Sequence, residues 1–134
     1  MKVIIDTNLW ISFLIGKKLS VMKKLFSDKK LEIYVCKELV DELETVASRP
    51  KLEKYISHKD IVATLEIIDA FCINVKIRTQ AKSPIRDIKD LYLLSLADTI
   101  PADYILTGDK DLLVLRTHNQ TKILTYSDFV ANYL

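Results

Sequence analysis

Residues 3–8 read VIIDTN, a run of β-branched apolar residues closed by an aspartate. A short stretch that is apolar at every position predicts a strand buried on both faces, as in the parallel sheets of α/β proteins. Similar stretches lie at 33–35, 104–106 and 123–124, and apolar residues alternate with polar ones over 73–77. The sequence therefore predicts a central sheet of about five strands, most of them parallel.

Between and after these stretches, apolar residues recur with the spacing of a helix. The segments with this spacing are residues 9–14, 19–26, 39–47, 61–71, 91–97, 112–115 and a last one from residue 127. Strands that alternate with helices predict a three-layer α/β/α sandwich, in which helices cover both faces of the sheet. Residues 78–86, RTQAKSPIR, are predicted to be a loop.

The segment LYLLSLA at 91–97 differs from the other helical segments because apolar residues occupy nearly its whole circumference. A helix that is apolar on all sides is packed between other elements rather than on the surface. We therefore expect this helix to be central, and the groups at its ends to lie partly inside the protein.

The composition is that of one compact domain spanning residues 1–134. Hydrophobic residues make up 49% of the chain, and only two Gly and three Pro are present, which excludes a collagen-like, linker-rich or disordered chain. The 20 Lys and Arg residues against 18 Asp and Glu give a formal charge of +2. This charge is too small to identify a nucleic-acid binder, so a function must come from a local site.

The cysteines and the N-terminal residues favour a soluble cytoplasmic protein. Cys36 and Cys72 lack the spacing of a zinc knuckle and are too few for a disulfide framework. Asp6 and Asn8 interrupt the apolar core that a signal peptide would need. No stretch approaches the roughly 18 uncharged apolar residues that cross a bilayer, so no membrane contact is expected.

Two aspartates directly follow predicted strands: Asp6 follows residues 3–5, and Asp109 follows YILTG at 104–108. Ligands of parallel α/β sheets bind in the crevice beyond the carboxyl ends of the strands, and both side chains are expected to face it. Asp is also among the commonest helix caps and turn formers. A purely structural interpretation therefore stands beside the functional one for Asp6, Asp87 and Asp109.

Further carboxylates are expected near the same crevice. Asp90 opens the buried helix, where an unpaired charge would be costly, and it therefore needs a cation or a hydrogen-bond donor. Asp87 lies one turn earlier on the same face, where it could cap this helix with Asp90 at the third position. Glu42 and Glu44 flank the apolar stripe of their own helix on opposite sides, and the helical period does not choose between them.

Converging carboxylates without His or Cys form a hard-oxygen site, which suits Mg²⁺ or Mn²⁺ better than zinc. In the absence of metal, their mutual repulsion would raise one or more of their pKa values. Metal ions held in this way activate a water and stabilise the charge that develops on phosphorus oxygens. The predicted chemistry is hydrolysis of a phosphodiester, as in a nuclease.

Four motifs in this order and spacing resemble the PIN-domain ribonucleases: DTN at 6–8, VDELETVASRPKL at 40–52, RDIKDLYLLSLA at 86–97 and ADYILTGDKDLL at 102–113. The resemblance implies a PIN fold, one or two Mg²⁺ or Mn²⁺ ions, and endoribonucleolytic cleavage of RNA. The acids that it assigns to metal binding and catalysis are Asp6, Glu42, Asp90 and Asp109. It prefers Glu42 over Glu44 because Glu42 opens the E-L-x-x-V-x-x-R-P-K run.

The motifs are most similar to those of PIN proteins from bacterial and archaeal toxin-antitoxin modules. This resemblance implies a toxin, a cognate antitoxin protein that blocks its site, and a homodimer. Such proteins usually carry D-P-x-D before the buried helix, whereas Ile88 follows Asp87 here. The difference removes a proline and no metal ligand.

Residues beside the acids are candidates for supporting roles. Accessory positions next to the predicted metal ligands are Asn8, Asp87, Thr107 and Asp111. Candidate contacts to the RNA phosphates are Arg86, Lys89 and Lys110. The lysines of residues 17–30 either steer RNA phosphates toward the acids or form a solvated helix face.

Two other classes of function remain open. A receiver-like signalling domain also places acids and Mg²⁺ at strand ends. It needs paired acids after its first strand, where this chain has Asp6 alone, and the second predicted strand ends at Cys36. The other alternative is a PIN-shaped protein that binds RNA or a partner without cleaving, which the presence of all four acids disfavours.

Overall fold

The computed structural model describes residues 1–82 and 90–133. The strands in these ranges are β1 (Lys2–Ile5), β2 (Glu32–Val35), β3 (Ile73–Asn74), β4 (Tyr104–Leu106), β5 (Thr117–His118) and β6 (Thr121–Leu124). The α-helices there are α1 (Thr7–Ile15), α2 (Leu19–Ser27), α3 (Lys37–Ala47), α4 (His58–Phe71), α5 (Leu91–Thr99), α6 (Lys110–Leu113) and α7 (Tyr126–Tyr133). A single 3₁₀ turn, η1 (Pro50–Leu52), follows α3.

The strands form one sheet in the order β3-β2-β1-β4-β6-β5. Every neighbouring pair is parallel except β5 and β6, which are antiparallel. The mostly parallel α/β fold predicted from the sequence is therefore confirmed. The predicted helix at 61–71 is also found, and it begins three residues earlier than expected, at His58.

The described part of the sheet has six strands, one more than the five or so that the sequence predicts. The additional strand is β5, which is only two residues long and pairs with β6 at the edge of the sheet. Its residues, Thr117 and His118, carry no apolar pattern. It is held by backbone pairing with β6 and by a 3.1 Å contact between Nε2 of His118 and the Asp98 carboxylate, neither of which hydrophobic periodicity can reveal.

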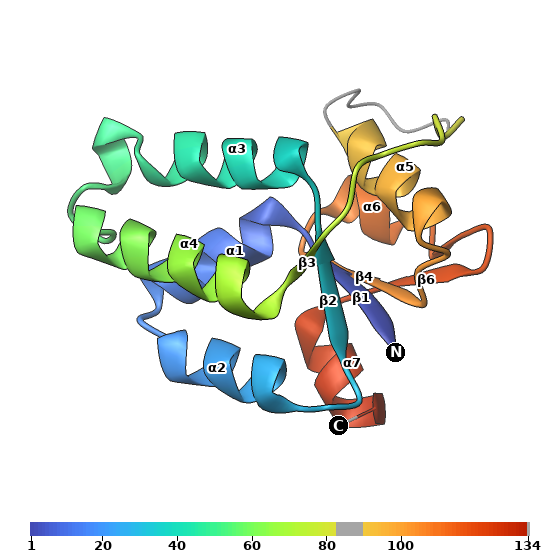
Figure 1. Ribbon diagram of the computed structural model, residues 1–134, viewed down its shortest axis with the longest axis horizontal. Coiled ribbons are helices and arrows are strands. Elements are labelled where there is room, and N and C mark those ends of the chain that lie inside the picture. Colours follow the sequence, from blue (N-terminus) through green and yellow to red (C-terminus); the bar gives the residue numbers. More distant parts are fainter. Residues whose placement is uncertain (83–89, 134) are drawn as a thin grey trace.

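Helices cover both faces of the sheet (Figure 1). Helices α1 to α4, which connect the first three strands, gather on one side, and α5 and α6 lie on the other. Helix α7 returns to the first side, where the ring of Tyr126 packs edge-on against Phe13 of α1, with 5.1 Å between the ring centroids. The predicted three-layer arrangement is confirmed.

The most deeply buried elements are the ones that the sequence marks as apolar on all sides. Val3, Ile4 and Ile5 of the central strand β1 are all buried, because both faces of this strand are covered by helices. In α5, five consecutive residues from Leu93 to Ala97 are buried. This helix is central, as predicted, and its first residues, Leu91 and Tyr92, are half-buried.

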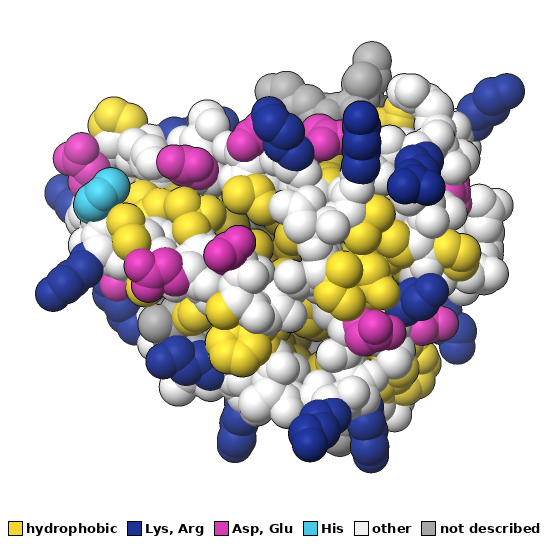
Figure 2. Space-filling model, viewed as in Figure 1, with side chains coloured by type: hydrophobic (Ala, Val, Ile, Leu, Met, Phe, Trp, Pro, Cys, Tyr) yellow, Lys and Arg dark blue, Asp and Glu magenta, His cyan; other side chains and the backbone are white. Residues whose placement is uncertain are grey.

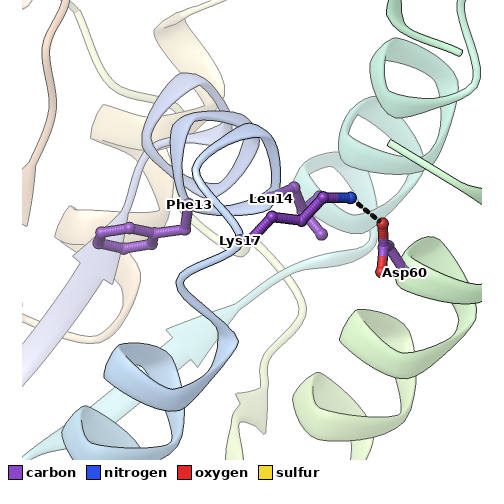
Figure 3. Close-up of a pocket in the computed structure, with 4 residues that line it drawn as sticks. All are labelled: Phe13, Leu14, Lys17 and Asp60. Carbon is purple, nitrogen blue, oxygen red and sulfur yellow. Dashed lines mark hydrogen bonds and ion pairs between the residues drawn. The ribbon is translucent and has the colours of Figure 1, made fainter. Parts of the chain in front are cut away.

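Helix α4 begins with a capping box that also anchors the end of α1 (Figure 3). Ser57 and Asp60 exchange side-chain to backbone hydrogen bonds, each 3.1 Å long. The Asp60 carboxylate also accepts a 2.8 Å hydrogen bond from Nζ of Lys17, beside a small hollow lined by Phe13 and Leu14. The Lys17 contact is the main reason that the pKa of Asp60 is lowered. Both side chains are partly exposed, so this ion pair adds little to stability.

The lysines between residues 17 and 30 are exposed. Figure 2 shows dark-blue side chains projecting along the lower edge of the molecule, where Figure 1 places α2. Exposure fits both interpretations of these lysines, the solvated helix face and the steering of RNA phosphates. No helix in the described part of the chain combines the length and the apolar character needed to cross a bilayer.

Candidate active site

The candidate site lies where β1 and β4 end side by side. The chain leaves β1 toward β2 on one side of the sheet, and it leaves β4 toward β6 on the other. Such a switch in strand order opens a crevice at the carboxyl ends of the two strands. The amide of Asp6 donates a 2.9 Å hydrogen bond to the carbonyl of Leu106, which brings the residues after both strands together.

Asp6 is the most deeply buried acid of the candidate site, with 3% of its surface exposed. It precedes α1, but its side chain makes no capping hydrogen bond to this fully described helix. Its Oδ2 instead accepts a 2.7 Å hydrogen bond from the hydroxyl of Thr107. The interpretation of Asp6 as a simple helix cap is therefore wrong.

Burial is the main reason that the pKa of Asp6 is raised above its ordinary value. The hydrogen bond from Thr107 opposes this shift, and the charges of Glu42 and Asp109 add to it. These two acids are therefore close enough to Asp6 to repel it. The sequence predicts repulsion between these carboxylates, and it contributes to the raised pKa of Asp6, the most buried of them.

Glu42 is half-buried on α3 and is held by a tyrosine. Its Oε2 accepts a 2.6 Å hydrogen bond from the hydroxyl of Tyr92 on α5. The same hydroxyl lies 3.2 Å from Oγ1 of Thr7, the first residue of α1. Tyr92 has one hydroxyl hydrogen and gives it to Glu42, so Thr7 is the donor in the second contact. The result is a chain of hydrogen bonds from Thr7 through Tyr92 to Glu42.

The choice between Glu42 and Glu44, which helical spacing leaves open, has a structural answer. Glu42 contacts Tyr92 and raises the pKa of Asp6, so it faces the crevice. Glu44 is exposed and lines a different hollow, between α3 and α4, together with Asp69. The orientation of Glu42 toward the crevice agrees with the E-L-x-x-V-x-x-R-P-K motif, which favours Glu42 over Glu44.

Asp109 is half-buried and precedes the short helix α6. Its Oδ1 accepts a 2.9 Å hydrogen bond from the amide of Asp111, so the capping interpretation is confirmed for this residue. Its own amide donates to the hydroxyl of Thr107 at 3.0 Å. Thr107 thus contacts both Asp6 and Asp109, which makes the residue predicted as accessory a physical link between the two acids.

Asp90 lies at the beginning of α5, half-buried and with helical backbone angles. The helix α5 is bounded by Leu91 and Thr99 with Asp90 at its N-cap position, and the predicted pairing of Asp90 with Asp87 lies outside the described residues. Two residues further along is Tyr92, whose hydroxyl reaches α1 and α3. This end of α5 therefore faces the other acids.

The remaining predicted residues fall into two groups. Asn8 in the first turn of α1, Lys110 at the start of α6 and Asp111 beside it are exposed. Arg86, Asp87 and Lys89 lie outside the described residues. The exposed residues are accessible to a large ligand, whereas the acids at the centre are recessed.

Comparison with known proteins decides the family, because residues 2–111 match the family model of the PIN domain. The chain belongs to the PIN domain family. Proteins of this family are generally nucleases, and the match leaves the receiver-like interpretation without support.

Two similar proteins extend this comparison. The uncharacterized protein MJ1680 of Methanocaldococcus jannaschii is 33% identical over 146 residues, which cover 99% of this chain and 92% of the relative. Among solved structures, the T. brucei RRP44 PIN domain aligns with a TM-score of 0.49 and 17% identity, over 96% of this chain and 78% of that one.

PIN domains generally bind Mg²⁺, and the donors of the candidate site fit such an ion. Asp6, Glu42 and Asp109 offer only oxygen, the donor type that hard divalent cations prefer. A positive charge would also relieve the repulsion that raises the pKa of Asp6. Among the described residues, however, no three His, Cys, Asp or Glu side chains are gathered closely enough to hold an ion. In this PIN domain the acids are instead held by hydrogen bonds from the protein.

The thiols of this PIN domain are poor ligand candidates. Burial raises the pKa of Cys36, which follows β2, to about 11, and that of Cys72 to about 12. Both thiols therefore stay protonated near neutral pH, whereas a metal ligand or nucleophile must be a thiolate. This agrees with a site built from oxygen alone.

Sequence reasoning missed Tyr92 and Thr7. In the sequence pattern Tyr92 is one more apolar position of the buried helix, and Thr7 is the middle residue of the DTN motif. One signal was available: a tyrosine in a helix that is buried all round must place its hydroxyl against a partner. The facing element that supplies this partner cannot be found from the helical period.

Proposed function

We propose that this PIN domain is a metal-dependent endoribonuclease that hydrolyses RNA phosphodiester bonds. The observation that supports this most directly is Asp6, which is buried at the switch point and repelled by Glu42 and Asp109. A buried acid with two acidic neighbours destabilises the fold unless a cation is held there. Such a cluster is typical of functional sites.

The residues that would hold one or two Mg²⁺ or Mn²⁺ ions are Asp6, Glu42, Asp90 and Asp109. The ions, when bound, would activate a water and stabilise negative charge on the phosphate oxygens. Thr107 positions Asp6 by donating to it, and its contact with the amide of Asp109 fixes the loop after β4. Arg86, Lys89 and Lys110 would bind the RNA phosphates, and Asn8, Asp87 and Asp111 would support the bound ions and water.

The proposal includes a role as the toxin of a toxin-antitoxin module in the cytoplasm. The resemblance of the motifs to such toxins supports this role, together with an antitoxin partner and a homodimer. Sedimentation of the purified chain at micromolar concentration tests the last point, because a dimer is expected, and a monomer alone would remove it. Copurification with a small protein encoded beside it would support the antitoxin.

The main alternative is a PIN domain that binds RNA or a partner without cleaving. It is favoured by one observation, that the described acids are not gathered at the spacing of a metal site. Both functions require an accessible crevice, and only the nuclease requires the carboxylates themselves.

The test is cleavage of single-stranded and structured RNA in Mg²⁺, Mn²⁺ or EDTA by the wild type, Asp6→Asn and Asp109→Asn. Asp69→Asn, which changes an exposed acid on α4, is the matched control. Cleavage that needs metal, is lost in the first two variants and persists in the control supports the proposal. RNA binding that is unaffected by EDTA and by both substitutions, with no cleavage, supports the alternative.

A further inference from the structure

Tyr92 joins three helices at the candidate site. Its side chain comes from α5, its hydroxyl donates to Glu42 on α3, and it accepts from Thr7 on α1. The 2.6 Å distance to Glu42 is in the range of a charge-assisted hydrogen bond from a hydroxyl to a carboxylate. None of the predicted metal ligands or phosphate contacts accounts for this arrangement.

We propose that Tyr92 is a positioning residue, which fixes the Glu42 carboxylate for metal binding and is itself oriented by Thr7. This inference rests on the proposed function, because it concerns how the same site holds its ion. Tyr92 does not contact the reacting groups in this scheme. It acts only through Glu42.

Glu42 needs such a partner because of where it lies. Its side chain is long, and it is half-buried near the middle of α3 rather than enclosed like Asp6. Ordering a glutamate side chain costs conformational entropy, so the unsupported carboxylate would sample solvent. The Tyr92 hydroxyl uses Oε2 and so restricts the directions in which the carboxylate can point.

Thr7 has a specific part in the chain of hydrogen bonds. The Tyr92 hydroxyl can rotate, and a donor on its other side favours the orientation in which its hydrogen points to Glu42. Thr7 is buried and supplies this donor at 3.2 Å. Because Thr7 is the neighbour of Asp6, this series of hydrogen bonds couples the orientation of Glu42 to the end of β1.

The decisive measurement is the affinity for Mn²⁺, followed by electron paramagnetic resonance of the free ion. Tyr92→Phe is expected to weaken binding by about 10–100-fold, the usual effect of removing a hydrogen-bond partner of a metal ligand. Thr7→Val is expected to weaken it in the same direction but less. Tyr126→Phe, which changes a tyrosine of α7 in contact with Phe13, is the matched control and should bind Mn²⁺ like the wild type.

A double-mutant cycle separates positioning from a general effect on the fold. In a Glu42→Ala background, Tyr92→Phe should cause no further loss of Mn²⁺ affinity, because the group that it acts on is gone. An equal loss with and without Glu42 would overturn the inference, as would an unchanged affinity in Tyr92→Phe. Circular dichroism of each variant confirms that the protein measured is folded.

The outcomes also distinguish this inference from the proposed function. Wild-type binding of Mn²⁺ with no effect of Tyr92→Phe overturns the role of Tyr92 and leaves the nuclease proposal standing. Absence of Mn²⁺ binding by the folded wild type overturns both. A loss of affinity that depends on Glu42 supports both.

Discussion

The hydroxyl of Thr107 donates a 2.7 Å hydrogen bond to Asp6, a residue 101 positions earlier in the chain. The two residues follow the neighbouring parallel strands β4 and β1, and this bond crosses between them at the switch point of the sheet. Among the described residues, it is the one contribution from a side chain that stabilises the ionised form of Asp6 against burial and against its acidic neighbours. Thr107 therefore favours the ionised form of Asp6, which is the form that can bind a cation.

Thr107→Val is predicted to damage both stability and metal binding. Valine keeps the shape of the side chain but removes the donor to Asp6 and the acceptor for the amide of Asp109. Loss of buried hydrogen-bond partners costs about 1–3 kcal/mol, and the pKa of Asp6 should rise further. Urea unfolding and Mn²⁺ titration measure the two effects.

Thr107→Ser is the matched control, because it removes a methyl group and keeps the hydroxyl. A buried methyl contributes about 0.8 kcal/mol, so some stability is lost here as well. The Mn²⁺ affinity should be retained in Thr107→Ser and reduced in Thr107→Val. Equal Mn²⁺ affinity in the two variants would show that the hydroxyl is unimportant for the site.

Asp6→Asn is predicted to stabilise the metal-free protein, and increasingly so as the pH rises. The folded-state pKa of Asp6 is raised above its ordinary value of 3.8, so the favourable protonated form is present at low pH and lost as the pH rises through the raised pKa. Asparagine does not titrate in this range. The gain in unfolding free energy over the wild type should therefore be small near about pH 4 and larger near about pH 8.

The comparison requires urea unfolding in EDTA at several pH values. Asp69→Asn, at an exposed position on α4, controls for removal of one negative charge. The expected result is a pH-dependent difference for Asp6→Asn alone. A constant difference across the pH range would mean that burial and repulsion do not perturb Asp6 in solution.

The fold could be predicted because its central elements carry their environment in their composition. VII at 3–5 and LYLLSLA at 91–97 are apolar on nearly all sides, and residues 3–5 of β1 and 93–97 of α5 are buried. Strand β5 could not be predicted, because Thr117 and His118 carry no apolar pattern and are held by backbone pairing and by the contact of His118 with Asp98. The local sequence pattern predicts a strand from its buried apolar residues, and β5 has none.

The candidate site could be predicted only in part, for a related reason. Residues that follow strands, such as Asp6, are placed by topology, which the sequence predicts. The direction of Glu42 and its bond to Tyr92 depend on how α3 and α5 face each other, and helical spacing contains no such information. Capping also proved compatible with a place in the site, since Asp109 caps α6 and still repels Asp6.

Binding of Mg²⁺ or Mn²⁺ is predicted to stabilise the wild type. Asp6→Asn should be the more stable protein without metal, and the wild type should be the more stable one with metal. A ligand at a hundred times its dissociation constant adds about 2.7 kcal/mol to the unfolding free energy if it binds only the folded state. The variant should gain much less, because one carboxylate is missing. Thermal unfolding in EDTA and in saturating metal should therefore rank the two proteins in opposite orders.

Ionic strength is the control for this measurement, since added salt also screens the repulsion around Asp6. Sodium chloride at matched ionic strength should raise the stability of the wild type only slightly. Equal stabilisation by sodium and by divalent salt would argue against a specific ion at this site.

Glu42→Gln and Glu44→Gln are predicted to have opposite consequences, although the two residues are neighbours on one helix. Glu42 faces Asp6 and Tyr92, whereas Glu44 is exposed over another hollow. A metal ligand that contributes several kcal/mol to the transition state corresponds to a loss of about a thousandfold in cleavage rate for Glu42→Gln. Glu44→Gln, a surface change, should stay within about twofold of the wild type. Cleavage of the same RNA by the two folded variants decides between them, and the reverse ranking would mean that α3 presents its other face to the substrate.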